Sequence, residues 1–535
     1  MMKFKYITSV ILTAALVFTL LAVTACDSDS GTDANGSGDR YGGSLIVANA
    51  LTPAHLDTDI TTDSTIGQLM FHVYEGLFEI DENFMPVPHL AENYSLSDDG
   101  TTYTIQLRED VLFHDGTGMT SDDVIASFER WLAVNGAGNN IEPYFVSIEA
   151  NGDYEVVISL SEPYAPFLSF LSSVVANQKF TVKPKTLIEQ FGGDIMTEHI
   201  GTGPFELVDF VPDQYVEMKR FEDYSPHPGE PFGYSGEKIA YVDELIFRIV
   251  PEQAMRVAGL QTGEYHFADF APRDQITQFE NDADIQTFIV SPYRQSFIIV
   301  NMGHAPFDDK MTRQAMRYAL DMEELAFSMV GDEDFWFLNP SLFPPGHIWH
   351  VPEGDGGRYN SPDPDRAREM LEQSGYDGTP IIILNSREDD IESRGALAIQ
   401  SQLEQVGFTV DVQLYDRATV VEQRSQVDGW HLHLSQFFSP DPDPQVYGAW
   451  MGTNKWIGNW DDEESAEMDE IFTRMLSETD YNARHAIVQE WHEYFYETVP
   501  YVKLFDFRQL RIARVSLQGY ENFAFHTFFN VWLDE

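Results

Sequence analysis

A single cysteine, Cys26, occurs in this chain of 535 residues, and it stands directly after an apolar N-terminal run. Two lysines precede the run, which covers residues 7–23 and is followed by Thr24 and Ala25. A basic start, a short apolar core and small residues before a cleavage point are typical of a secretory signal peptide. With one cysteine the exported part cannot form an internal disulfide, so its stability must come from core packing and surface chemistry.

The position of Cys26 resembles the bacterial lipobox, in which the cysteine is lipidated and becomes the new N-terminus. We therefore predict a signal peptide over residues 1–25 and acyl chains on Cys26 that hold the protein at a membrane surface. The alternative is a transmembrane anchor with an incidental cysteine, which the shortness of the apolar run disfavours. Residues 26–40 continue without an apolar run and predict a flexible tether, with folding from Tyr41.

The chain is strongly acidic, with 87 aspartates and glutamates against 32 lysines and arginines and a net charge of -55. Such a surface repels nucleic acid, so we expect no nucleic-acid partner. We interpret the acidity as a solvated coat rather than as a cation-capture device, and its combination with scarce lysine suggests a salt-rich habitat. Because salt screens self-repulsion, we predict higher thermal stability in molar salt than in dilute buffer.

Alternating strand and helix signals predict an α/β protein with several subdomains. A strand-helix-strand unit with a parallel strand pair is expected from residues 380–384, 393–405 and 408–414. Further strands are predicted at 45–48 and 102–107, and further helices after a capping-box-like start at 120–123 and at 314–325, 363–374 and 481–496. In the last helix, Ala483, Ile487, Trp491 and Tyr494 are expected to form the buried face.

Signatures of catalysis are absent from the sequence. There is no Gly-x-Ser-x-Gly elbow and no phosphate-loop motif. His431 and His433 alternate on a predicted strand and could face one site, but two histidines are at best half of a zinc site, so a structural role is favoured. The acidic run at 461–464 lacks the glycine and spacing of a calcium loop. We predict no catalytic residue, no metal site and no cofactor, and therefore a binding protein.

Several short sequence motifs in this chain are together specific for one protein family. They include VYEGLF at 73–78, FHDG at 113–116, GTGPF at 201–205 and LQTGE at 260–264. In combination they resemble the family 5 extracellular solute-binding proteins, the dipeptide, oligopeptide and nickel receptors of ABC importers. The resemblance runs from about Tyr41 to the C-terminus.

The resemblance implies a two-lobed α/β fold of the periplasmic-binding-protein type (class II), with an extra subdomain in the first lobe. The first lobe is expected over residues 41–300 with the extra subdomain at about 79–195, the second lobe over 301–505, and a return segment to the first lobe over 506–535. In this family the ligand binds between the lobes, which close by a hinge. The implied partners are a small solute and an ABC permease and ATPase complex, with the receptor itself a monomer.

The loop that binds the ligand amine departs from the family pattern. In the peptide receptors an aspartate in the second lobe pairs with the α-amino group, in a loop that usually reads Asp-Tyr-Pro-Asp-Pro. Here residues 437–444 read FFSPDPDP, which puts Phe438 at the place of that aspartate. Because a buried unpaired ammonium is costly, either Asp441 or Asp443 substitutes, or the ligand presents no free amine there.

Five further residues are candidates for ligand contact by the same resemblance. Arg387 lies roughly where dipeptide receptors place an arginine for the ligand carboxylate, although it could equally be a solvent-facing arginine among acids. Asp63 and Ser64 belong to a loop that could supply first-lobe contacts. Trp456 and Trp460 could wall the cleft, although aromatic side chains are more often part of a core.

The sequence therefore predicts a lipid-anchored receptor that captures short peptides between two lobes and delivers them to a permease, either in the periplasm or on the outer face of the cytoplasmic membrane. The first alternative keeps this role for a non-peptide solute such as a metal chelate, an opine or a sugar conjugate. The second alternative, an exported hydrolase, would need a catalytic cluster that the sequence does not contain.

Overall fold

The computed structural model describes residues 40–61, 63–174, 179–438, 443–453, 455, 458–523 and 525–534, without the side chains of Ser64, Pro292, Tyr293 and Phe438. The predicted signal peptide, most of the tether with Cys26, and also Asp441 and Trp456 lie outside the described residues. None of the described helices combines the length and the hydropathy needed to cross a lipid bilayer.

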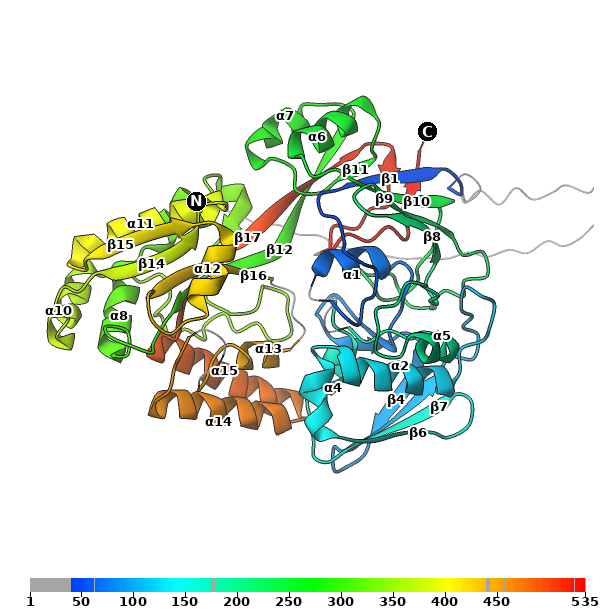
Figure 1. Ribbon diagram of the computed structural model, residues 1–535, viewed down its shortest axis with the longest axis horizontal. Helices are drawn as coiled ribbons and strands as arrows, with labels where there is room; N and C mark the ends of the chain where they lie inside the picture. Colours follow the sequence, from blue (N-terminus) through cyan, green and yellow to red (C-terminus); the bar gives the residue numbers. More distant parts are fainter. Residues whose placement is uncertain are drawn as a thin grey trace, which may run out of the picture. The chain divides into compact units, whose positions relative to one another are not determined.

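An eleven-stranded sheet forms the centre of the fold, in the order β15-β14-β16-β12-β17-β11-β1-β10-β9-β8, with β13 attached to β17. Its strands are β1 (Ser44–Asn49), β8 (Phe205–Val211), β9 (Tyr215–Arg220), β10 (Glu244–Ile249), β11 (Phe267–Ala268), β12 (Ile285–Val300), β13 (Trp336–Phe337), β14 (Ile381–Ser386), β15 (Val410–Tyr415), β16 (Leu432–Phe438) and β17 (Tyr501–Arg514). Strands β12 and β17 run antiparallel side by side through its middle (Figure 1).

Three smaller sheets and a set of helices complete the described structure. The small sheets contain β2 (Phe78–Ile80) with β3 (Pro86–Pro88), then β4 (Ala91–Leu96), β5 (Thr102–Leu107), β7 (Glu155–Leu160) and β6 (Phe145–Ala150), and finally β18 (Leu517–Gln518) with β19 (Trp532–Leu533). The helices are α1 (Ser64–Met70), α2 (Ser121–Val134), α3 (Gly138–Ile141), α4 (Phe167–Leu171), α5 (Lys185–Phe191), α6 (Gln253–Thr262), α7 (Ile276–Glu280), α8 (Lys310–Ala319), α9 (Met322–Met329), α10 (Pro364–Ser374), α11 (Asp390–Val406), α12 (Arg417–Arg424), α13 (Gln445–Gly448), α14 (Glu463–Ser477) and α15 (Tyr481–Thr498), with 3-10 turns at Glu142–Tyr144, Arg273–Gln275 and Glu333–Phe335.

The predicted strand-helix-strand unit is present. Strands β14 and β15 pair in parallel and α11 connects them. Asp389 begins the helix by accepting hydrogen bonds from the backbone of Ile391 and Glu392, and Gly407, at φ 110°, ends it in a left-handed conformation that glycine adopts without steric cost. Helix α2 likewise begins at the predicted capping box, in which Thr120 pairs with Asp123.

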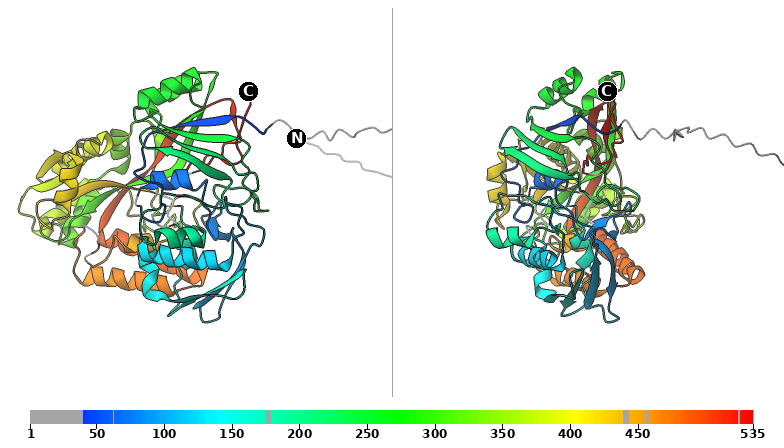
Figure 2. Two further views of the ribbon diagram at one scale, coloured as in Figure 1. Left: turned by 45° about the vertical axis from the view of Figure 1, so that its right-hand side comes forward. Right: turned by 90° about the vertical axis from the view of Figure 1, so that its right-hand side faces the viewer.

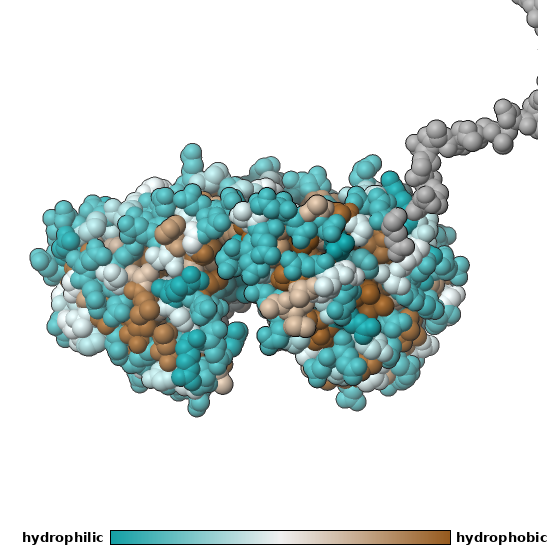
Figure 3. Space-filling model, turned by 90° about the horizontal axis from the view of Figure 1, so that it is seen from above, coloured by the Kyte–Doolittle hydropathy of each residue, from teal (hydrophilic) through white to brown (hydrophobic). Residues whose placement is uncertain are grey.

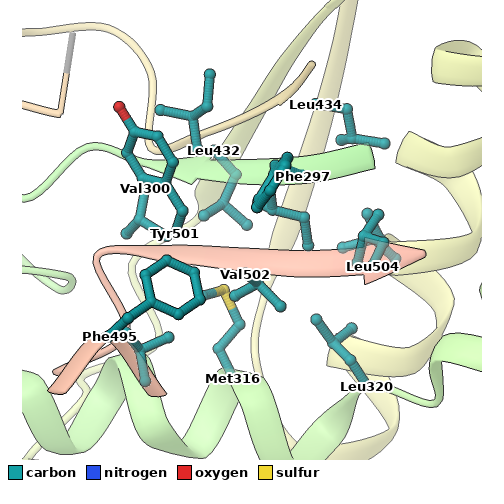
Figure 4. Close-up of a cluster of buried hydrophobic side chains, with 14 of the residues drawn as sticks. Phe297, Val300, Met316, Leu320, Leu432, Leu434, Phe495, Tyr501, Val502 and Leu504 are labelled. Atoms are coloured by element: carbon teal, nitrogen blue, oxygen red, sulfur yellow. The ribbon is translucent and has the colours of Figure 1, made fainter. Parts of the chain in front are cut away.

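The largest hydrophobic core packs the β12, β16 and β17 strands against α8 and α15. Figure 4 shows Phe297, Leu432 and Val502 of these strands together with Met316 and Phe495 of the helices, and Val502 lies beside Met316. All five side chains are buried. Along the chain this core extends from Phe297 to Phe507.

Separate cores lie under the other elements. One packs α2 against the four-stranded sheet β4–β7, within residues 77–182, and these blue and cyan elements stay together in each view of Figures 1 and 2. Another joins N-terminal strand residues such as Leu45 to C-terminal residues such as Phe528.

Seen from above, a notch hollows the largely hydrophilic surface between the side that carries α10–α12 and the side that carries β8–β10 (Figure 3).

The two long strands contribute to different cores at their two ends. Ile285 of β12 and Leu510 of β17 belong to the core around Phe279, whereas Phe297 and Val502 of the same strands belong to the largest core. The strand register shifts between Val290 and Arg294 of β12, so the ladder is irregular between the two ends.

Two local predictions were wrong. The helix expected at 314–325 is two helices, because Asp321 accepts hydrogen bonds from the backbone of Glu323 and Glu324 and so begins α9. In α15 the expected burial of Ala483 is also wrong, since Ala483 is exposed and the next residue, Arg484, is buried in an ion pair.

Candidate ligand-binding site

A polar cavity of about 380 Å³ opens beside the carboxyl ends of β14 and β16. Its walls come from β12, from the connection between β14 and α11, from α12 and from β16. Strand β14 is parallel to both β15 and β16, and in open α/β sheets ligands bind outside the carboxyl ends of parallel strands. We call this space the polar cavity.

Three arginines form one part of its wall. Arg417 and Arg424 are the first and last residues of α12, and Arg294 comes from β12. Arg424 Nη1 donates to His433 Nε2 at 2.9 Å, and His433 Nδ1 donates to the backbone oxygen of Leu384 at 2.8 Å. Because arginine only donates and a carbonyl only accepts, the ring is neutral with its proton on Nδ1. Burial, and then the neighbouring arginines, lower the pKa of His433 to about 4.

Three acids, Glu388, Asp389 and Glu392, form another part of the wall. Asp389 is occupied as the cap of α11. Glu392 Oε2 accepts a hydrogen bond from Asn385 Nδ2 at 3.0 Å. Burial, followed by the charge of Asp389, raises the pKa of Glu392 to about 7, so this carboxyl is easily protonated near neutrality.

A second cavity, of about 240 Å³, is aromatic and lies between distant parts of the chain. Tyr94 and Tyr103 line it from the four-stranded sheet, and Trp349 and Tyr481 line it from the C-terminal half. The two parts also touch directly, since the backbone nitrogen of Ala165 donates to Leu476 at 2.7 Å. Ile348 makes the same kind of contact with Asn83 at 3.0 Å, and the rings of Phe84 and His347 stack with centroids 4.7 Å apart.

Asp443 is buried and bound on both carboxylate oxygens by Arg484, at 2.7 Å each. The structure thus gives this predicted ligand residue an internal partner. Asp63 caps α1 by accepting from the backbone of Thr65 at 2.9 Å. Trp460 belongs to the largest core, at 2% exposure, and does not line the polar cavity. Ligand contact by these residues stays a prediction.

Arg387 follows the last residue of β14, is exposed and does not line the polar cavity. Phe438 lies at the carboxyl end of β16, where its backbone pairs with Arg294 of the cavity wall. The side chains of Phe438 and Ser64, and all of Asp441 and Trp456, lie outside what the structure describes.

The cavity arginines were missed from the sequence. Arg417 and Arg424 are seven residues apart, which places them two turns apart on one face of a short helix. That spacing, directly after a strand that ends a parallel pair, is the signal that could have found them. Arg294 gives no comparable signal, because it lies inside the long strand β12.

His431 and His433, which alternate on the predicted strand, contact different residues and do not share one site. His431 Nδ1 accepts from the backbone of Ile382 at 2.9 Å and its ring lies against His304, whereas His433 contacts Arg424. In the part of the chain that the structure describes, no group of three or more His, Cys, Asp or Glu residues could hold a metal ion.

A family model described as bacterial extracellular solute-binding proteins, family 5 Middle, matches residues 85–459. The chain belongs to the family 5 extracellular solute-binding proteins. It is therefore a solute-binding receptor of the ABC importer type and not an enzyme.

Individual relatives agree with this assignment. A probable peptide ABC transporter periplasmic-binding protein, y4tO, from Sinorhizobium fredii is 27% identical over 81% of this chain and 82% of its own length. The glutathione-binding protein GsiB from Escherichia coli K12 is 28% identical over 78% of this chain and 82% of its own. The crystal structure of the substrate-binding protein CtaP from Listeria monocytogenes superposes with a TM-score of 0.80 at 20% identity, covering 93% of this chain and 100% of CtaP, and confirms the predicted periplasmic-binding-protein fold.

Proposed function

We propose that this receptor is exported, held at a membrane by a lipid on Cys26, and delivers a short peptide or a related solute to a permease and ATPase complex. The observation that carries the proposal is the polar cavity at the carboxyl ends of β14 and β16, where charged groups of both signs converge. The relatives support it, since y4tO is described as a peptide-transporter protein and GsiB as a glutathione-binding protein.

We also propose that the chain works as two lobes joined by a hinge, with the first lobe over 41–300, its extra subdomain at about 79–195, the second lobe over 301–505 and a return segment from 506. The separate hydrophobic cores support this division. Because β12 and β17 each enter two cores, the hinge would lie within these strands, near the register shift between Val290 and Arg294.

A non-peptide solute is the second candidate. Two observations favour it: Phe438 stands where peptide receptors have the amine-binding aspartate, and Asp443 is already engaged by Arg484. A metal chelate, an opine or a sugar conjugate would not require an amine at that place.

Release of the bound solute tests the proposal and separates the candidates. The receptor is purified from its native membrane, denatured, and the released small molecules are identified by mass spectrometry. A pool of short peptides supports the first candidate, and a chelate, opine or sugar conjugate supports the second. A receptor that releases nothing and shows no thermal shift with a library of peptides and amino-acid conjugates would contradict both.

A further inference from the structure

We propose that the polar cavity binds the α-amino-acid end of the solute, in which an ammonium and a carboxylate are carried by the same carbon atom. This inference rests on the proposed receptor function and names the chemical class of its solute. A conventional peptide carries these two charges at opposite ends, whereas a side-chain-linked conjugate of an amino acid carries them together.

The first argument concerns one charged residue of each sign in the wall of the cavity. The side chains of Arg417, on α12, and Glu388, before α11, both line it. Neither side chain forms a hydrogen bond or an ion pair with any residue that the structure describes. Two unpaired opposite charges around one cavity leave room for a ligand that carries both signs.

The second argument concerns the carboxylate. The guanidinium of Arg424 is fixed by its bond to neutral His433, and the charge of Arg417 lies close enough to lower the pKa of Arg424, after the larger effect of burial. The charge of Glu392 acts on Arg424 in the opposite direction, so this part of the wall favours a negatively charged neighbour. Guanidinium groups bind carboxylates with two parallel hydrogen bonds, so a carboxylate fits this part of the wall.

The third argument concerns the ammonium. Burial disfavours the charged form of Glu392, and repulsion between the carboxylates of Glu392 and Asp389 adds to that effect. A cation between Glu392 and Glu388 would relieve that cost. Because these acids and the arginines line one cavity of about 380 Å³, the two charges they bind must be near each other.

A pair of isomers tests the inference. Binding of γ-L-glutamyl-L-alanine and of α-L-glutamyl-L-alanine to the purified receptor is measured by isothermal titration calorimetry. The two have the same atoms and the same net charge, but only the γ-isomer carries an ammonium and a carboxylate on one carbon. We expect the γ-isomer to bind at least about tenfold more tightly. Equal binding, tighter binding of the α-isomer or binding of neither would overturn the inference, while the receptor function is tested separately by the released solute.

Variants assign the effect to the cavity. We expect Arg417→Gln and Glu388→Gln each to weaken binding of the γ-isomer about tenfold or more and to reduce its advantage over the α-isomer. Arg394→Gln is the matched control, because Arg394 is an exposed arginine of α11 that does not line the cavity. A loss with Arg394→Gln as large as with Arg417→Gln would show a general charge effect and overturn the assignment. Circular dichroism of each variant verifies the fold.

Discussion

Asp443 and Arg484 form a buried ion pair in which both Nη atoms of the arginine lie 2.7 Å from the two carboxylate oxygens. Asp443 ends the loop after β16, and Arg484 belongs to α15. The same arginine donates through Nε to the backbone of Met475 at 2.8 Å and lies 4.9 Å from the ring centre of Trp349. The pair thus fixes one end of the predicted amine-binding loop to a helix and to the wall of the aromatic cavity.

Breaking this pair is expected to destabilise the fold strongly. Arg484→Met leaves the Asp443 carboxylate buried without its partner, which costs about 3–5 kcal/mol of unfolding free energy in urea titrations. The control is Arg474→Gln, because Arg474 pairs with Glu490 in equally good geometry on the exposed surface. That change is expected to cost less than about 1 kcal/mol. Equal costs for the two variants would contradict the prediction.

Glu392 gives a pH dependence of stability with a defined sign. Its pKa is raised from 4.5 to about 7, by burial first and by Asp389 second, against the opposing effect of Asn385, Arg417 and Arg424. The contribution of Glu392 to the free energy of unfolding is therefore fully present below pH 4.5 and is lost as the pH rises through about 7.

Glu392→Gln removes this titration. We expect the melting temperature of the variant to rise relative to the parent protein between about pH 5 and about pH 8, measured in the same buffers and salt. A difference between the two proteins that is independent of pH, or one that changes in the opposite direction, would show that the Glu392 carboxyl titrates normally.

Gly201 is required by a close approach of two backbones. A Cβ atom at this position would overlap the backbone oxygen of Val73. We expect Gly201→Ala to cost about 3 kcal/mol, since backbone atoms cannot move aside as a flexible side chain does. Gly118→Ala is the control, because its Cβ would meet no atom within 4 Å. Thermal unfolding compares the two, and a tolerated Gly201→Ala would refute the packing argument.

Salt is expected to stabilise the protein. With a net charge of -55, repulsion within the folded chain decreases when ions screen it. We expect a higher melting temperature in about 1 M salt, where the Debye length is about 3 Å, than in dilute buffer. Sodium chloride and potassium chloride should act alike. An unchanged melting temperature would show that self-repulsion does not limit stability.

Cys26 is expected to carry the membrane anchor. Cys26→Ala should abolish incorporation of a labelled fatty acid and move the protein from the membrane fraction to the soluble fraction of the producing cells. Retention of Cys26→Ala in the membrane fraction would favour the transmembrane anchor. The purified Cys26→Ala variant should bind its solute as the parent does, because Cys26 precedes the described residues, which line the polar cavity.

Local signals in the sequence were sufficient for much of the fold. The capping pair of Thr120 and Asp123 and the strand-helix-strand unit around α11 follow from periodicity and caps, and both are present. The polar cavity was not predicted, because its residues converge only in the folded chain. Arg417 approaches the acids before α11 through the pairing of β14 with β15, whereas Arg387, adjacent to those acids in sequence, lies outside the cavity. Trp460 lies buried in the largest core, and its expected contact with the ligand stays a prediction.

The shared strands constrain the movement that we propose for the two lobes. Because β12 and β17 are hydrogen-bonded neighbours and each is embedded in two cores, sliding one along the other would break their ladder and disturb both cores at once. Flexing the pair together across the irregular step after Val290 preserves the bonds on both sides of it. We therefore expect opening to be a rotation about a single axis that crosses both strands, without a compliant linker that would permit shear.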